Sequence, residues 1–160
     1  MKERQMKQAW FVCLFLLCGC LPDDSAGREI VFETARIEIE RRKLPPLPLN
    51  VELAKSPAQR ERGLMFRTEM ADDAGMLFLF ETPRKIGMWM ADTPLSLDMF
   101  FIDASGVIRH IAEYTEPFSR DVITTDGKMT SVLEMKAGSA RRFDISEGDI
   151  VRHPVFNIEK

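Results

Sequence analysis

The feature that most constrains the fold of this chain is the shortness of its apolar runs, which turn residues repeatedly interrupt. Residues 75–80 are apolar on both faces, and six residues bounded by Asp72-Asp73 and Pro83 suit a buried strand better than a helix. Phe32 to Glu40 alternates between apolar and polar residues, as a half-buried strand does. The same reasoning predicts strands at residues 32–40, 51–54, 75–80, 86–90, 97–103, 107–114, 130–136 and 150–158.

Prolines and turn residues set the expected boundaries between these strands. The proline-rich stretch 41–48 is expected to be an extended connector, because proline cannot donate to a sheet. Residues 103–106 carry a hairpin signal, and residues 119–128 are expected to form a polar loop. Pro154 interrupts the last strand, which we therefore expect at a sheet edge.

Helical signals are confined to two short segments. Ser56 can cap a helix that begins with Pro57, Gln59 completes a capping box, and Gly63 suits the C-terminal cap of a helix over about 57–62. Ser139 favours a second short turn within residues 139–145. About eight short strands with one or two short helices predict an all-β fold, a compact and mostly antiparallel β-barrel or jelly-roll-like sandwich.

The N-terminus has the pattern of an export signal. Residues 1–8 are basic and residues 9–17 are apolar, and all three cysteines lie within or just after this apolar run, at Cys13, Cys18 and Cys20. The apolar run is about half the length that crosses a bilayer. Its Leu-Cys-Gly-Cys ending resembles the lipobox of bacterial lipoproteins. That resemblance implies a signal peptide over residues 1–19 and lipidation of Cys20, and the anchor makes the membrane a partner.

The rest of the chain follows from this division. Residues 20–29 are expected to be a tether and residues 30–160 a single β-domain. The exported chain would face the periplasm from the outer membrane of a Gram-negative cell, since Leu21 rather than Asp follows the lipidated residue. An uncleaved anchor and a buried N-terminal helix are the alternatives.

Composition excludes several classes of function. Lipidation of Cys20 leaves no free cysteine, which excludes a thiol nucleophile, a cysteine-ligated zinc site and a redox pair. Without residues 1–19 the chain keeps 19 basic and 24 acidic residues, a net charge of −5. An acidic domain is a poor partner for nucleic acid. His110 and His153 lack metal-ligand spacing, so no metal and no cofactor are expected.

Five ordered blocks of sequence resemble the prokaryotic DUF192 family, a domain of unknown function. The blocks are Arg60-x-Arg62-Gly63-Leu64-Met65-x-Arg67, Gly75-Met76-Leu77-Phe78, Trp89-Met90 with Pro94-Leu95-x-Leu97-Asp98-x-x-Phe101-Ile102-Asp103-x-x-Gly106-x-Ile108, Val132-Leu133-Glu134 and Gly148-Asp149. The resemblance covers about residues 50–152 and implies a compact β-barrel or jelly-roll-like sandwich with a short helix. It implies no activity. Ala91 and Asp92 depart from the family pattern, which usually has a basic residue and then Asn there.

Two acidic residues stand out because strand alternation places them among apolar neighbours. Asp98 shares a face with Phe100 and Ile102, and Glu134 shares one with Val132. A buried acid costs free energy unless it is paired or hydrogen-bonded. The nearest predicted partners are Arg60, Arg62 and Arg67. The alternative to a functional site is a purely structural role, in which Asp98 caps a turn after Pro94 and Glu134 makes one ion pair with an arginine.

The leading functional hypothesis is a lipid-anchored β-domain, not an enzyme, that binds a small polar ligand or an envelope protein. Its candidate site combines arginines for anionic groups, an aromatic wall and two orienting acids: Arg62, Arg67, Trp89, Asp98 and Glu134. One alternative is an envelope hydrolase whose two carboxylates, Asp98 and Glu134, act across a cleft. Another is Cu(I) binding through methionines such as Met88 and Met90, with core packing as the competing explanation.

Overall fold

The computed structural model describes residues 30–156, and its elements confirm the predicted all-β class. In chain order they are β1 (Glu33–Glu40), β2 (Leu47–Ala54), α1 (Pro57–Arg62), β3 (Ala74–Arg84), β4 (Gly87–Met88), β5 (Leu97–Ile102), β6 (Ile108–Ala112), β7 (Ile123–Thr124), β8 (Met129–Lys136), α2 (Ser139–Arg142) and β9 (Ile150–Arg152). The predicted signal peptide, the lipidated Cys20 and the tether lie outside the described residues. No helix within residues 30–156 is long and apolar enough to cross a bilayer.

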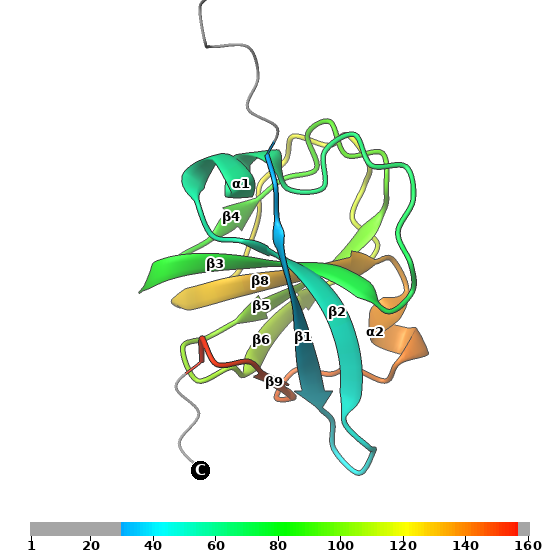
Figure 1. Cartoon of the computed structure of the whole chain (residues 1–160), viewed down its shortest axis with the longest axis vertical. Coiled ribbons are helices and arrows are strands. Elements are labelled where there is room, and N and C mark those ends of the chain that lie inside the picture. The colour runs from blue at the N-terminus through cyan, green and yellow to red at the C-terminus, as the bar shows by residue number, and fades with distance from the viewer. Residues whose placement is uncertain (1–29, 157–160) are drawn as a thin grey trace, which may run out of the picture.

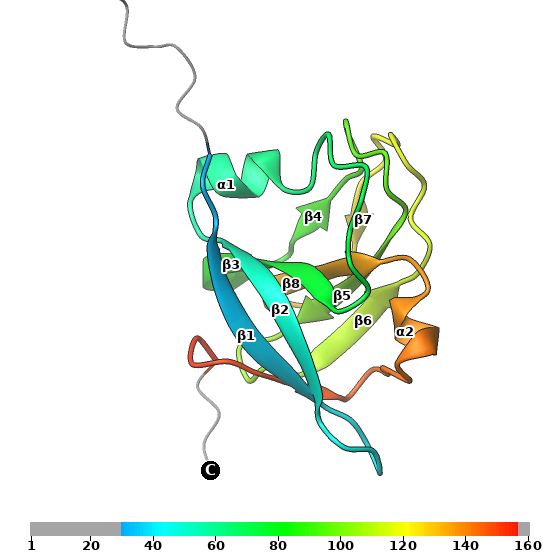
Figure 2. The ribbon, with the colours of Figure 1, turned by 45° about the vertical axis from the view of Figure 1, so that its right-hand side comes forward.

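Seven strands form one strongly curved sheet in the order β6-β5-β8-β3-β2-β1-β9 (Figure 1). Every neighbouring pair is antiparallel except β2 and β3, which run parallel because the segment holding α1 crosses between them. The last strand brings the two ends of the sheet together. Ile150 bridges to Val107 beside β6, and the Val151 amide donates to the Gly106 carbonyl at 2.8 Å. The sheet is therefore a nearly closed barrel (Figure 2).

Three predicted boundaries were wrong. Strand β2 begins at Leu47 and so includes part of the expected connector. Its first residues pair only with β1, and pairing with β3 starts at Asn50, so the missing N–H of Pro48 interrupts no second ladder. The strand expected over residues 86–90 is reduced to β4, which pairs with β7 inside the predicted 119–128 loop.

The last strand also differs from its prediction. It stops at Arg152, before the His153-Pro154 pair, and the proline thus ends the strand. As expected, it is the last strand in the order of the sheet, where it pairs with β1, and a single bridge from Ile150 to Val107 lies on its other side.

The capping box of α1 is confirmed. The Ser56 hydroxyl accepts from the Gln59 amide at 3.2 Å, and the Gln59 side-chain oxygen accepts from the Ser56 amide at 2.9 Å. The helix ends at Gly63, whose φ of +45° lies in the left-handed region. A Cβ there would also sit 3.1 Å from the Phe78 ring, so glycine lets α1 lie close to β3.

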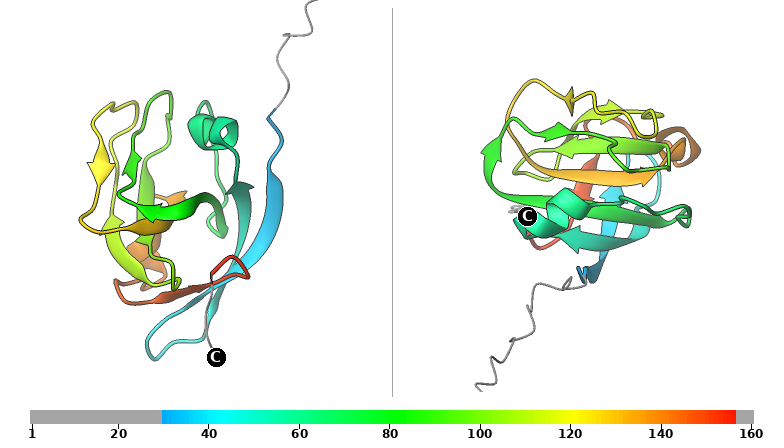
Figure 3. Two further views of the ribbon diagram at one scale, coloured as in Figure 1. Left: turned by 90° about the vertical axis from the view of Figure 1, so that its left-hand side faces the viewer. Right: turned by 90° about the horizontal axis from the view of Figure 1, so that it is seen from above.

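The two faces of the sheet bury separate cores. The inner core takes residues from all seven strands of the sheet and fills the barrel, with Phe100, Leu133 and Ile37 among its members. The outer core lies on the opposite face of β3, β5 and β8 and is rich in methionine, including Met76, Met90, Met99 and Met129. Figure 3 shows α1, β4 and β7 on the side that covers this outer face.

Candidate functional site

The five predicted site residues do not form one cluster. Asp98 and Glu134 lie on neighbouring strands, but the register pairs Asp98 with Met135 and Met99 with Glu134. Directly paired residues point to the same face, so Asp98 faces the inner core with Met135, and Glu134 faces the outer core with Met99. The two carboxylates therefore point to opposite sides of the sheet and share no cleft. The two-carboxylate hydrolase hypothesis does not fit this arrangement.

Asp98 is a completely buried acid whose two oxygens are both used within the fold. One oxygen accepts from the Tyr114 amide at 2.9 Å and the other from the Ala140 amide, also at 2.9 Å. The second bond satisfies a free N–H in the first turn of α2, where Gly138 offers no side-chain cap. Asp98 thus caps α2 and not a turn after Pro94, and no arginine pairs with it among the described residues.

Glu134 is buried under different conditions. Its side chain is 4 % exposed, and its direct neighbours across the sheet are Met76 and Met99. Within residues 30–156 the carboxyl has no hydrogen bond and no ion pair, so the predicted arginine pair is absent there. Burial raises the pKa of Glu134 to about 8, because the charged form loses its hydration without gaining a partner. At pH 7 this side chain is therefore mainly a neutral acid.

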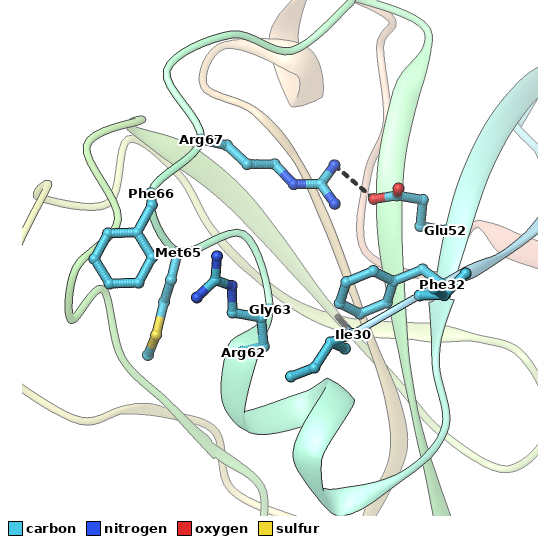
Figure 4. A pocket seen from close by; sticks show the side chains of 9 residues that line it. Ile30, Phe32, Glu52, Arg62, Gly63, Met65, Phe66 and Arg67 are labelled. Atoms are coloured by element: carbon cyan, nitrogen blue, oxygen red, sulfur yellow. Dashed lines mark ion pairs between the residues drawn. The ribbon is translucent and has the colours of Figure 1, made fainter. Parts of the chain in front are cut away.

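Arg62 and Arg67 are brought together at one cavity, which we call the arginine pocket (Figure 4). Its volume is about 580 Å³. It lies where the residues before β1 meet β2 and the segment after α1, and it is lined by Ile30, Val31, Phe32, Glu52, Arg62, Gly63, Met65, Phe66 and Arg67. Two cations thus share a cavity whose lining is partly polar and partly apolar.

The two arginines of the pocket are held differently. A nitrogen of Arg67 lies 2.6 Å from a carboxylate oxygen of Glu52, and its guanidinium stacks near Phe32 at 5.7 Å. Arg62 lies over the Phe66 ring at 4.7 Å and has no ion pair within the described part of the chain. With Glu52 as the single acid, the lining carries a net positive charge, so it favours anions.

Backbone geometry beyond α1 fixes the pocket's aromatic edge. Phe66 has a φ of +65°, which is uncommon for a bulky residue, and its amide donates to the Asp92 carbonyl at 2.7 Å. Strain of this kind costs about 1–3 kcal/mol and persists only where neighbours enforce it. The 60 % exposed Phe66 ring is consequently held outward beside Arg62.

Trp89 lies in a different cavity, on the other side of α1. This second pocket, about 440 Å³, is lined by Pro57, Arg60, Glu61, Phe78, Phe80, Arg84, Gly87, Met88 and Trp89. Arg60 and Arg84 both stack on the Phe80 ring, at 5.0 and 4.6 Å. Trp89 thus lines a cavity, but not the pocket that holds Arg62 and Arg67.

Sequence reasoning missed several lining residues. Phe32 precedes β1 and Glu52 lies on β2, and no local signal connects them with Arg67. Phe66 carried a usable signal, since it stands next to Arg67 inside one of the DUF192 blocks. The pairing of Phe80 with Arg84 depends on how β3 continues past Leu79, where its register with β8 shifts.

The family model of DUF192, described as an uncharacterized ACR, matches residues 37–153. The chain belongs to the DUF192 family. None of the curated proteins searched shows a detectable match to this DUF192 chain. The family name supplies the fold and leaves the activity open.

Two solved structures are similar to this DUF192 chain. A protein from Sinorhizobium meliloti, described as a candidate transcription regulator, is 41 % identical with a TM-score of 0.76, and the match covers 78 % of this chain and 97 % of that one. A protein of unknown function from Novosphingobium aromaticivorans is 31 % identical with a TM-score of 0.72, covering 75 % of this chain and 85 % of that one. The first of these structures thus consists almost wholly of the region that matches this chain.

Proposed function

We propose that this DUF192 chain is an exported, lipid-anchored binding protein, and that the arginine pocket takes a small anion bearing an apolar part. The observation that carries the proposal is the convergence of Arg62 and Arg67 on one partly apolar cavity. An anionic head would meet the guanidinium groups, and an apolar tail would lie against Phe32, Phe66 and Ile30.

Arg62 is the residue we assign to the anion itself. Arg67 is already neutralised by Glu52 at 2.6 Å, which fixes its orientation. Arg62 has only an aromatic contact among the described residues, so its N–H groups are free to bind a carboxylate or phosphate. The negative charge of the exported chain gives no support for nucleic acid as the partner.

The experiment compares two ligands that share one tail, octyl phosphate and octyl glucoside, by isothermal titration calorimetry on residues 30–160. Both are used below their micelle concentrations. Octyl phosphate is expected to bind and octyl glucoside not. Loss of one charge-assisted interaction is worth about 1.5–3 kcal/mol, so Arg62→Gln is expected to weaken octyl phosphate binding roughly 10- to 100-fold.

Arg36→Gln is the matched control, because Arg36 is an exposed arginine on β1 outside the pocket. It is expected to bind octyl phosphate as the unchanged domain does. Equal weakening by both substitutions would mean nonspecific attraction and would remove the pocket assignment.

The anchor is tested separately, by feeding cells that produce the full chain with labelled palmitate. Label is expected in the membrane-bound protein and is expected to disappear in Cys20→Ser. Labelling that persists in Cys20→Ser would contradict lipidation at this cysteine.

A further inference from the structure

Five apolar side chains at one end of the barrel are well exposed, and we call them the apolar rim. They are Val31 (73 %), Phe66 (60 %), Trp89 (49 %), Phe118 (62 %) and Val122 (63 %). Isolated exposed apolar residues are ordinary, but a gathered set of large ones marks an interaction surface.

Backbone contacts hold together the segments that carry three of the rim residues, Phe66, Trp89 and Phe118. The Phe66 amide donates to Asp92 and the Phe118 amide donates to Thr93, at 2.7 and 3.1 Å, so both segments attach to the same loop beyond Trp89. The Met90 amide also donates to Ser119 at 3.0 Å.

The two valines join the rim from either side. A Cβ on Gly87 would lie 2.9 Å from a methyl of Val122, which places Val122 beside the β4 strand that precedes Trp89. Val31 lines the arginine pocket together with Phe66. The segments that carry the rim residues thus run from the start of the described chain, past α1, to the segment before β7, and Figure 3 shows these segments at the same end of the barrel.

The rim is built with strained backbone. Phe66 and Phe118 have φ values of +65° and +62°, and Asp92, which binds the Phe66 amide, has a φ of +53°. Bulky residues rarely adopt this conformation, and such strain is typical of functional segments. Here it directs two aromatic rings into solvent, where they contribute nothing to the core.

We propose that the apolar rim rests on the lipid bilayer surface to which the chain is anchored. This inference rests on the proposed anchor at Cys20. The described chain starts at Ile30, at the rim end beside α1 (Figure 1), and residues 20–29 can span at most about 35 Å. A tether of that reach keeps this end near the membrane. Aromatic side chains suit the bilayer interface, and Arg60, Arg62 and Arg84 nearby can reach lipid headgroups.

Trp89 makes the proposal directly measurable. It is the single tryptophan of residues 20–160, since the other is Trp10, and Cys20 is the single cysteine of that stretch. The chain from residue 20 is coupled through Cys20 to a maleimide lipid in vesicles of phosphatidylethanolamine and phosphatidylglycerol. Trp89 emission is then expected to shift to shorter wavelength and to be quenched by brominated lipids in the same vesicles.

The double variant Phe118→Ser with Val122→Ser is expected to lower the equilibrium ratio of quenched to unquenched Trp89 about tenfold or more, because two exposed apolar side chains no longer insert. Leu44→Ser is the matched control, because Leu44 is an exposed apolar residue in the β1–β2 turn at the opposite end of the barrel (Figure 1). It is expected to leave quenching unchanged.

A relocated tryptophan tests orientation. In Trp89→Phe with Leu44→Trp, the emission is expected to stay unquenched, and quenching equal to that of Trp89 would overturn the proposal. Trp89 emission that is the same with and without vesicles would also overturn it. So would a dimer in solution that already shields Trp89 from water in the absence of lipid. These outcomes leave octyl phosphate binding by residues 30–160 and palmitate labelling intact, so they are distinguishable from failure of the proposed function.

Discussion

Strands β3, β8 and β5 bury one carboxyl group on each of their two faces, and only the carboxyl group on the inner face has hydrogen-bond donors among the described residues. On the inner face, Asp98 receives two backbone N–H donors from Tyr114 and Ala140. On the outer face, Glu134 lies between Met76 and Met99 with no polar partner within residues 30–156. The two acids thus have similar neighbours in the sequence but different electrostatic environments. Asp98 accepts two hydrogen bonds, whereas burial raises the pKa of Glu134 to about 8.

The largest expected loss of stability comes from replacing Asp98, the acid that accepts two hydrogen bonds. Asp98→Ala leaves the Tyr114 and Ala140 amides without acceptors, and each unsatisfied buried donor costs about 1–3 kcal/mol. We expect the free energy of unfolding to fall by about 3–5 kcal/mol, measured by urea denaturation. Asp98→Asn keeps one acceptor and should lose about half as much. A loss below about 1 kcal/mol in Asp98→Ala would show that the two bonds do not hold α2.

The second largest expected effect is an increase in the free energy of unfolding. Glu134→Gln removes an acid whose folded pKa, about 8, lies above the ordinary value of 4.5. Between these pH values the folded state binds more protons than the unfolded state, so stability falls as pH rises from about 4.5 to about 8. At pH 7 the penalty is about 3 kcal/mol. The variant should therefore gain stability at pH 7 and little at pH 4.5.

Urea denaturation of both proteins across pH 4–9 checks this difference. The stability gap between them should open steadily above pH 4.5 and level off near pH 8. A gap independent of pH would mean that Glu134 titrates normally and that the contrast between the two faces is mistaken.

The smallest effect concerns the methionines around Glu134. If Met76 and Met99 only fill space, Met76→Leu and Met99→Leu conserve volume and should each cost less than about 1.5 kcal/mol. Neither change should alter copper retention, measured by elemental analysis after loading with Cu(I) and dialysis. Loss of bound copper in either variant would support the Cu(I) hypothesis at the outer face.

Local patterns predicted the fold class well, for identifiable reasons. The capping box of Ser56 and Gln59 and the 103–106 turn are decided within a few residues, and both are confirmed. The extent of β2 and the position of β9 depend on which strand lies beside them. Pro48 is tolerated because only β1 pairs there, and the neighbours of β9 lie about 110 and 40 residues away in sequence.

The candidate site was predictable only where its residues are close in sequence. Arg62 and Arg67 flank one turn after α1 and meet in one pocket. Asp98 and Glu134 could not be distinguished in the sequence, because the alternation of apolar and polar residues along a strand predicts burial but not hydrogen-bond partners. The face that each one occupies depends on strand register, and the donors that satisfy Asp98 come from residues 16 and 42 positions away.

The closure of the barrel by β9 sets the order in which this chain can finish folding. Glu38, Ile39 and Glu40 lie near the start of the domain, yet their β9 partners, Arg152, Val151 and Ile150, are among the last residues described. Contacts this distant in sequence form late, because a long loop must close first. A chain synthesised from its N-terminus cannot complete its barrel until residue 152 is available. The three-residue strand that closes the core thus keeps the earlier strands waiting for a partner more than 100 residues further along the chain.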